Sequence, residues 1–256
     1  MSEPRIRLRG LRKSFGEKRV LDGVDLEVAA GTSLVVIGGS GSGKSVLLKC
    51  VLGLIEPDAG TIEIDGVDIL ALDARARRAA RAAIGMLFQN GALFDSLPVW
   101  ENVAFGPLAR RTLARRDARA FAARILASVG LADSVGALYP SALSGGMQKR
   151  VALARAIAGE PAILFFDEPT TGLDPIVGAI IDQLVVDCVK RLGSTAIAIT
   201  HDMASARRIG DRAAMLHHGR IVWDGPAARL FDSGNAIVDQ FTHGRSEGPI
   251  TMELRR

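Results

Sequence analysis

The chain has 256 residues, of which 48% are hydrophobic and 23% are charged, with a formal net charge of +4. This length suffices for one large domain, and the composition excludes a disordered chain. Aromatic residues make up only 5%, which argues against a nucleic-acid platform built from stacked rings. No run of 18 apolar residues is present, and the first ten residues lack the apolar core of a signal peptide. We therefore expect neither a membrane span nor a leader.

The expected elements alternate between strands and helices. In chain order we expect strands at 6–8, 24–28 and 34–37, a helix at 45–54, a strand at 61–64, a helical stretch at 97–158, a strand at 162–166, a helix at 177–192, a strand at 195–200, a hairpin at 213–223 and a polar tail from 234. This alternation predicts an α/β fold with a mostly parallel sheet covered on both faces. The strand-rich start and the helical middle are then additions to one core.

Arginine is concentrated in two Ala/Arg runs, at 75–81 and 110–124. Such runs fit either a patch for nucleic acid or an anionic membrane, or two solvated helix faces. Acidic residues balance most of the charge and no recognition motif accompanies the runs. We therefore expect solvated helix faces and no nucleic-acid partner. The two cysteines, Cys50 and Cys188, lack CxxC spacing and stand in apolar stretches, so we expect them to be buried and reduced.

One segment has the phosphate-loop pattern G-x-x-x-x-G-K-[ST]. It consists of Gly38, Gly39, Ser40, Gly41, Ser42, Gly43, Lys44 and Ser45. A buried strand precedes it and a helix follows it, as the pattern requires. Glycines let the backbone N–H groups surround a phosphate, and the helix N-terminus adds partial positive charge. Lys44 then reaches the β- and γ-phosphates and Ser45 offers its hydroxyl to Mg²⁺. The predicted nucleotide contacts extend to Val46.

Two acidic residues, Asp167 and Glu168, come directly after the apolar strand at 162–166. The carboxyl end of such a strand is where open α/β sheets bind ligands. Asp167 is placed to hold Mg²⁺, and Glu168 is placed to polarise the attacking water as a general base. The alternative is an acidic pair at the start of the following helix, which is less plausible beside a phosphate loop.

Further motifs make the chain resemble ABC-type ATPases over nearly its whole length. They are the signature-like Leu143-Ser144-Gly145-Gly146-Met147, the Q-loop glutamine Gln89, the D-loop Gly172-Leu173-Asp174, the switch histidine His201, and Phe15 at the adenine-stacking position. The resemblance implies a P-loop NTPase fold with an N-terminal antiparallel β subdomain and a helical insertion. It implies a nucleotide-binding core at 1–89 and 159–235, a helical subdomain at 90–158 and a tail at 236–256. Met147 stands where the family usually has Gln.

The resemblance also implies an ATPase that uses ATP and Mg²⁺. It assigns catalytic roles to Lys44, Gln89, Glu168 and His201, metal binding to Ser45, Gln89 and Asp167, and nucleotide contacts to Phe15, Gly38–Val46, Ser144, Gly145, Gly146 and Asp174. In this family the signature residues face the nucleotide held by a second copy. Taken alone, Ser144 is a helix cap and His201 is a structural histidine.

A narrower likeness follows Gln89. The segment 88–103 resembles the ATPases of MCE-type lipid transporters, such as the Mla system, although Pro98 replaces the usual Thr. That resemblance implies phospholipid transport between bacterial membranes, a homodimer, an integral permease and an MCE lipid-binding protein. We expect Gln89 and the flank 93–103 to contact the permease, because Leu93, Phe94 and Trp100 are costly to leave exposed without a partner. It implies a peripheral place on the cytoplasmic side of the inner membrane. The alternatives are another small cargo (an amino acid, a metal or a drug) or a non-transport ABC ATPase. We also expect the tail to cross to the second copy.

Overall fold

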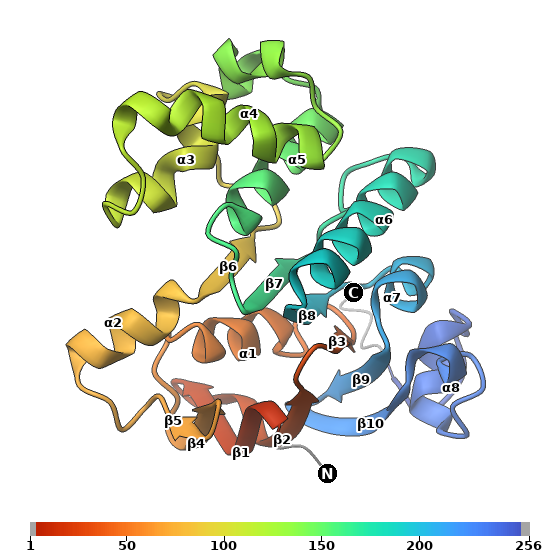
Figure 1. Cartoon of the computed structure of the whole chain (residues 1–256). Helices are drawn as coiled ribbons and strands as arrows, with labels where there is room; N and C mark the ends of the chain where they lie inside the picture. Colours follow the sequence, from red (N-terminus) through yellow and green to blue (C-terminus); the bar gives the residue numbers. More distant parts are fainter. Residues whose placement is uncertain (1–3, 252–256) are drawn as a thin grey trace. The chain divides into compact units, whose positions relative to one another are not determined.

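A computed structural model of the chain describes residues 4–251, except for the side chain of Ala82. The chain forms two compact units, one from residues 1–77 and 197–256 and the other from residues 78–196. The boundary falls within strand β8 (Thr195–Ile199) and within helix α2 (Ala74–Ala82) (Figure 1). This division differs from the core, helical insertion and tail that the sequence predicts, and that partition stays a prediction.

The first unit contains an antiparallel sheet. Its strands are β1 (Pro4–Phe15), β2 (Lys18–Ala29), β4 (Ala59–Ile64) and β5 (Val67–Asp68), in the order β2-β1-β4-β5. Ile6 pairs with both Val28 and Ile64. Along each strand these apolar side chains alternate with side chains that point outward, as expected for a sheet with one buried face. This sheet is the N-terminal antiparallel β subdomain that the sequence predicts.

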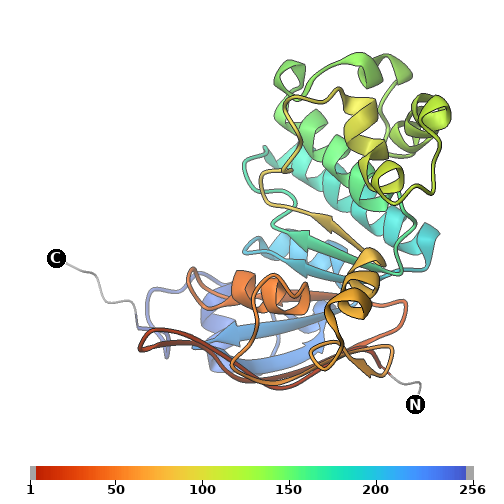
Figure 2. The same ribbon diagram turned by 90° about the vertical axis from the view of Figure 1, so that its left-hand side faces the viewer.

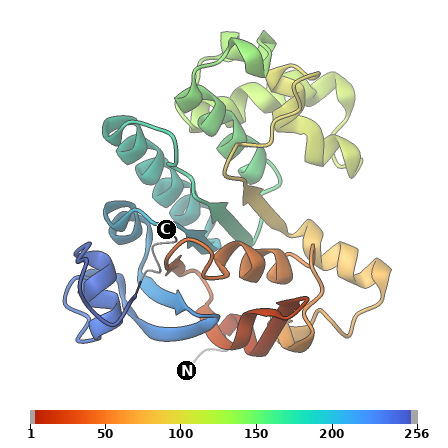
Figure 3. The same ribbon diagram turned by 180° about the vertical axis from the view of Figure 1, so that it is seen from behind.

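The same unit contains three further strands. The first leads into the phosphate loop, and the other two form a hairpin. Strand β3 (Ser33–Ile37) runs parallel to β9 (Arg212–His217), and β9 pairs antiparallel with β10 (Arg220–Pro226). Every residue of β3 is buried, as a strand covered on both faces requires. Helices α1 (Lys44–Val51), α7 (Met203–Ile209) and α8 (Ala236–Thr242) complete the unit, and α8 lies beside β10 (Figure 3).

The second unit is mostly helical. Its strands β6 (Ile84–Leu87) and β7 (Ile163–Asp167) are parallel, and its helices α3 (Val99–Ala109), α4 (Ala118–Ser128) and α5 (Gly145–Ile157) pack against one another (Figure 2). Short 3-10 helices lie at Arg115–Asp117, Asp133–Ala137 and Pro140–Ala142, and α6 (Pro175–Leu192) packs on α5. The helical stretch and strand β7 agree with the sequence. Strand β6 is not predicted from the sequence, because its four residues are too few for a periodic pattern.

Both cysteines are free and buried, in agreement with the sequence. None of the helices in the described part of the chain is long and apolar enough to cross a membrane. The first arginine run lies on α2 and the second lies between α3 and the middle of α4. Most of these arginines are exposed, as solvated helix faces require.

The described part of the tail folds back on its own chain. The backbone N–H of Ile250 donates to Gln240 Oε1 over 2.6 Å, and Gln240 Nε2 donates to the carbonyl of Ile250 over 3.0 Å. A crossing of the tail to a second copy therefore stays a prediction for its last residues. Met252 and Leu254, which the sequence places in an alternating apolar end, lie outside the described residues.

Candidate nucleotide-binding and hydrolysis site

The phosphate loop connects β3 to α1, and three of its glycines (Gly38, Gly41 and Gly43) have positive φ angles that other residues rarely adopt. Gly38 has φ 153° and Gly43 has φ 106°. A Cβ on Gly38 would lie 2.3 Å from the carbonyl oxygen of Leu216, and a Cβ on Gly43 would lie 2.8 Å from that of Val20. The surrounding backbone leaves no room for a side chain at either position, so glycine is required there.

The polar groups of this loop suit a phosphate. Lys44 is 8% exposed, and its ammonium donates to the carbonyl oxygens of Gly38 over 2.7 Å and Gly39 over 2.9 Å. Ser42 Oγ is buried and has no hydrogen-bond partner within residues 4–251, which is unusual for a buried hydroxyl. Helix α1 begins at Lys44 without a side-chain cap. The Lys44 ammonium, the Ser42 hydroxyl without a partner in the described residues and the uncapped start of α1 fit the phosphates of ATP.

The other predicted residues of the first unit are spread over its surface. Phe15 ends β1 with 50% of its surface exposed, and the ammonium of Lys13 lies 5.6 Å from its ring centroid. Ser45 is exposed in the first turn of α1, and Val46 beside it is half-buried. His201 is exposed and lies two positions after the last residue of β8. The exposed ring of Phe15 is available for stacking on a base.

In the second unit, Glu168 and Gln89 lie together. Gln89 Nε2 donates to Glu168 Oε2 over 3.0 Å, and Thr171 Oγ1 donates to the same oxygen over 2.8 Å. Asp167 is the last residue of β7 and is half-buried, and Glu168 directly after it has φ 47°. The structure thus holds one carboxylate oxygen of Glu168 with two donors, in a left-handed backbone conformation that is costly for a residue other than glycine.

Ser144 and Asp174 cap two helices of the second unit. The backbone N–H of Met147 donates to Ser144 Oγ over 3.4 Å, and Asp174 Oδ1 accepts from the N–H groups of Ile176 and Val177, each over 3.0 Å. Ser144 and Asp174 are both exposed. The local role as a cap is therefore present at both positions, and contact with a nucleotide on a second copy stays a prediction.

The sequence analysis assigned no role to two residues around Glu168. Thr171 stands three positions after Glu168, a spacing that allows a hydroxyl to reach back to the carboxylate. Lys149 is a single lysine on the apolar side of α5 and is only 7% exposed. A lysine that interrupts a buried helix face is a signal of a polar partner.

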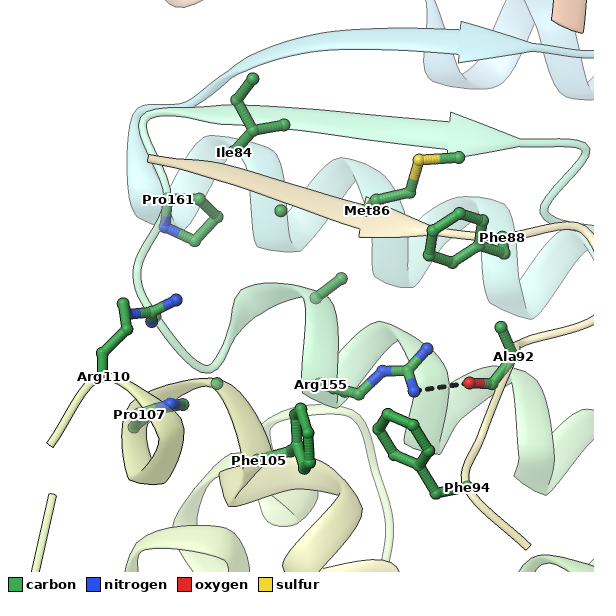
Figure 4. Close-up of a pocket in the computed structure, with 14 residues that line it drawn as sticks. Ile84, Met86, Phe88, Ala92, Phe94, Phe105, Pro107, Arg110, Arg155 and Pro161 are labelled. Carbon is green, nitrogen blue, oxygen red and sulfur yellow. Dashed lines mark hydrogen bonds between the residues drawn. The ribbon is translucent and has the colours of Figure 1, made fainter. Parts of the chain in front are cut away.

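A groove with a volume of about 460 Å³ lies beside this network in the second unit. The side chains of Phe88, Phe94 and Phe105 line it together with Arg110 and Arg155 (Figure 4). The rings of Phe94 and Phe105 are 4.5 Å apart between centroids, and Arg155 Nη1 donates to the carbonyl of Ala92 over 2.7 Å. Phe94 is 40% exposed, so the groove is apolar and open.

Two arginines lie against the ring of Trp100, and the predicted contact of this residue with a permease stays a prediction. Its ring lies under the guanidinium groups of Arg115 at 5.7 Å and Arg119 at 5.3 Å. Leu93 is half-buried and neither residue lines the groove. Of the three apolar residues that the sequence analysis expects at a permease contact, only Phe94 lies in the groove.

Comparisons with known proteins decide the family. A model of the ABC transporter family matches residues 21–171, which is more than half of the chain. The chain belongs to this family. The probable ribonucleotide transport ATP-binding protein mkl of Mycobacterium leprae (strain TN) is 40% identical over 248 residues, covering 96% of this chain and 71% of that protein. The methionine import ATP-binding protein MetN of Brucella abortus (strain 2308) is 41% identical over 239 residues, covering 93% of this chain and 64% of that protein.

Solved structures of ABC proteins have the same fold. The dimeric ATP-binding cassette MJ0796 in a post-hydrolysis state with ADP and Pi superposes with a TM-score of 0.79 at 32% identity, covering 87% of this chain and 98% of that chain. The protein cbiO1 from Clostridium perfringens, part of the ABC transporter complex cbiONQ, gives a TM-score of 0.81 at 28% identity, covering 91% of this chain and 92% of that chain.

The chain is accordingly an ATP-binding subunit of an ABC transporter with the predicted P-loop NTPase fold. It is an ATPase that uses ATP and Mg²⁺.

Proposed function

We propose that this ABC ATPase hydrolyses ATP with Glu168 as general base and thereby drives phospholipid transport between bacterial membranes through a separate permease. The observation that carries the catalytic part is the carboxylate of Glu168, which Gln89 and Thr171 hold through one oxygen at 3.0 Å and 2.8 Å. A general base needs a carboxylate that is held in a fixed position. The two donors hold the carboxylate of Glu168 in this way.

Different residues would bind the nucleotide and the Mg²⁺ ion. The loop from Gly38 to Val46 would hold the phosphates, with Lys44 turning from its carbonyl acceptors to the β- and γ-phosphates and Phe15 stacking on adenine. Ser45, Gln89 and Asp167 would hold Mg²⁺, which neutralises charge on the phosphates. The family resemblance assigns both sets to one nucleotide, and it adds His201 beside the γ-phosphate.

The proposal requires two copies arranged head to tail. Each ATP would lie between Lys44 of one copy and the capped helix start of the other, where Ser144, Gly145 and Gly146 offer N–H groups and Asp174 lies nearby in the fold. A helix N-terminus favours a negative γ-phosphate. Closure of the two copies would exclude water other than the nucleophile.

Mixing two inactive variants tests this arrangement. Ser144→Arg blocks the facing nucleotide and Lys44→Ala removes the phosphate ligand, so each homodimer should lack ATP turnover. The heterodimer has one site with both Lys44 and Ser144 intact, and we expect turnover to reappear on mixing. Each variant alone at the same total concentration is the control. A mixture that stays inactive although heterodimers form would contradict the head-to-tail site.

We propose further that the groove around Phe94 receives the permease, since it is apolar, open and next to the loop that carries Gln89. An exposed aromatic pair is costly unless a partner covers it. Phe94→Asp should leave ATP hydrolysis by the isolated subunit unchanged and abolish transport and permease co-purification. Leu138→Asp, at another exposed apolar residue of the same unit, is the matched control. Normal transport by Phe94→Asp would contradict the docking site.

The cargo proposal rests on the likeness of segment 88–103 to MCE-type ATPases and on the relative mkl. The partners of the ATPase would be a permease and an MCE lipid-binding protein. The ATPase would lie on the cytoplasmic side of the inner membrane. The names of the relatives offer ribonucleotides and methionine as rival cargoes. A non-transport role is the weakest alternative, because the chain carries no zinc cysteines and no long heptad insertion.

Reconstitution decides between these cargoes. The permease that co-purifies with the ATPase is placed in vesicles with it. ATP-dependent transfer of labelled phospholipid, uptake of methionine and uptake of a ribonucleotide are then measured in parallel. We expect only the phospholipid to move, and only when the MCE protein is present. ATP-dependent uptake of methionine or of the ribonucleotide without phospholipid transfer would contradict the lipid proposal.

A further inference from the structure

Lys149 joins three segments of the second unit through one side chain. Its ammonium donates to the carbonyl oxygen of Gln89 in a short hydrogen bond and to the carbonyl oxygen of Glu168 over 3.4 Å. The residue lies in α5, Gln89 follows β6, and Glu168 follows β7. Both acceptors are backbone atoms, so Lys149 holds the main chain of the Q-loop and of the proposed general base.

Placing an ammonium here carries a free-energy cost. Lys149 is 7% exposed, and burial lowers its pKa, while the negative charges of Glu168 and Asp167 act in the opposite direction. A buried charge destabilises a fold unless hydrogen bonds and opposite charge compensate it. Simple packing of α5 needs only an apolar side chain at this position. The position of the charge beside two acidic residues therefore indicates a role in the chemistry of the site.

The backbone at Glu168 shows what Lys149 holds. Glu168 has φ 47°, a conformation that costs about 1–3 kcal/mol for a residue other than glycine and persists only where its surroundings fix it. Its carbonyl accepts from Lys149 and from the backbone N–H of Thr171, over 3.4 Å and 3.3 Å. Its carboxylate accepts from Gln89 and from the Thr171 hydroxyl. Lys149 and Gln89 thus fix the two ends of the same residue.

We propose that Lys149 is a positioning residue that aligns the carboxylate of Glu168 and links it to the start of α5. This inference rests on the proposed role of Glu168 as general base. Helix α5 begins directly after Ser144, which in the proposed dimer faces the nucleotide of the other copy. A displacement of α5 by that nucleotide would move the ammonium of Lys149, and with it Gln89 and Glu168 of its own copy. One lysine would thereby connect the two ATP sites of the dimer.

The test compares three variants of the whole chain. Lys149→Met keeps the length of the side chain and removes its charge and donors, whereas Lys149→Arg keeps both. Arg150→Met is the matched control, since Arg150 is next on the same helix and donates to the carbonyl of Gly130 over 3.2 Å. We measure kcat and KM for ATP, binding of a fluorescent ATP analogue, and folding by circular dichroism.

Lys149→Met should lower kcat by about 10–100-fold, because small misplacements of a reacting group cost that much. ATP affinity and KM should change by less than about threefold, because uniform binding is not removed. Lys149→Arg should restore kcat to within about fivefold of the parent, as expected when charge and donors rather than shape matter. Arg150→Met should behave as the parent. The cooperativity of ATP hydrolysis should fall in Lys149→Met, if α5 transmits the state of the second site.

A double variant separates positioning from a structural role. If Lys149 acts through Glu168, Lys149→Met should cost nothing further in a Glu168→Gln chain, since residues acting as one unit are not additive. A multiplicative further loss, an equal loss of ATP binding, or a normal kcat in Lys149→Met would each overturn the inference. Failure of the proposed function looks different: Glu168→Gln itself would then retain turnover.

Discussion

Asn102 shows how one buried side chain shapes the loop that follows Gln89. It is fully buried, and its Oδ1 accepts from the backbone N–H of Phe94 over 2.8 Å. Its Nδ2 donates to the carbonyls of Phe94, Leu97 and Pro98 at 3.1, 2.9 and 3.3 Å. The first turn of α3 and the groove residue Phe94 therefore depend on this one amide.

Asn102→Ala should lower the free energy of unfolding by about 1–3 kcal/mol, because it leaves buried backbone groups without partners. Urea denaturation followed by circular dichroism measures the change. Asn90→Ala, at an exposed position of the same loop, should lie within about 0.5 kcal/mol of the parent. An unchanged urea midpoint for Asn102→Ala would mean that the loop is held by other contacts.

Cys50 reports on the packing of α1 just behind the phosphate loop. Burial raises the pKa of its thiol to about 11. At pH 8 only about 0.1% of the native thiol would be thiolate, the form that reacts with alkylating agents. Alkylation of Cys50 by iodoacetamide should be slow in native protein, accelerate about tenfold per pH unit up to pH 10, and be fast in urea. Equal rates at pH 8 in buffer and in urea, assigned by peptide mass spectrometry, would show that α1 is not packed as described.

Sequence reasoning identifies site residues better than their contacts. The glycine pattern predicts a phosphate loop because only glycine reaches φ 153° and 106° beside the carbonyls of Leu216 and Val20. The same reasoning finds Glu168 from its place after a buried strand. It cannot find the donors that hold Glu168, because Gln89 lies 79 positions away in the sequence and only the fold brings them together.

At the level of elements, the packing of α5 on α6 depends on Gly146. A Cβ at Gly146 would lie 2.9 Å from Val177 Cγ1, closer than real contacts allow. At Gly145 the nearest atom would be Leu173 Cδ2 at 3.6 Å, an ordinary contact. The second glycine of the signature is therefore needed for close helix packing, whatever its role toward a nucleotide.

A mutant cycle tests this packing. Gly146→Ala should destabilise the parent more than it destabilises a Val177→Ala chain, with a coupling of about 0.5–3 kcal/mol. The gain in helix propensity from alanine is present in both backgrounds and cancels. Gly145→Ala should not be coupled to Val177. Additive effects of Gly146→Ala and Val177→Ala on the urea midpoint would contradict the contact.

Strand and helix prediction succeeds where an apolar pattern is long enough. Strand β3 and helix α6 emerge from the sequence because buried residues fill the strand and follow helical spacing in α6. Strand β6 does not, since its buried and half-buried residues alternate over only four positions. No sequence pattern predicts that the segment from Thr242 to Ile250 folds back on α8 either. This fold depends on hydrogen bonds to the amide of Gln240, which is nearly buried.

For the whole molecule, we predict that the tail contributes to the dimer. Deletion after Gln240 removes the acceptors at Arg245 and Ile250 that the Gln240 amide uses, and should lower stability as well as raise the dimer dissociation constant. Deletion after Thr251 removes only the last five residues, and it should also raise the dissociation constant, as the predicted crossing of the tail to the partner requires. Both should retain ATP binding at the phosphate loop.

Sedimentation velocity over a range of concentrations, with ATP absent, measures both deletions. A weaker dimer for both variants would locate the contact beyond Thr251, and a weaker dimer for the longer deletion alone would locate it in the described tail. Sedimentation identical to the parent for both, alone and with the permease, would contradict any role of the tail in the dimer.

ATP turnover by Glu168→Gln tests most directly whether Glu168 is the general base. The amide keeps the size of the side chain and removes the base, so hydrolysis should slow by roughly 10²–10⁴-fold while ATP binding persists and the ATP-bound dimer accumulates. Glu160→Gln, at an exposed residue of the same unit, should hydrolyse ATP as the parent does. Near-normal turnover by Glu168→Gln would contradict the assignment of Glu168 as the general base.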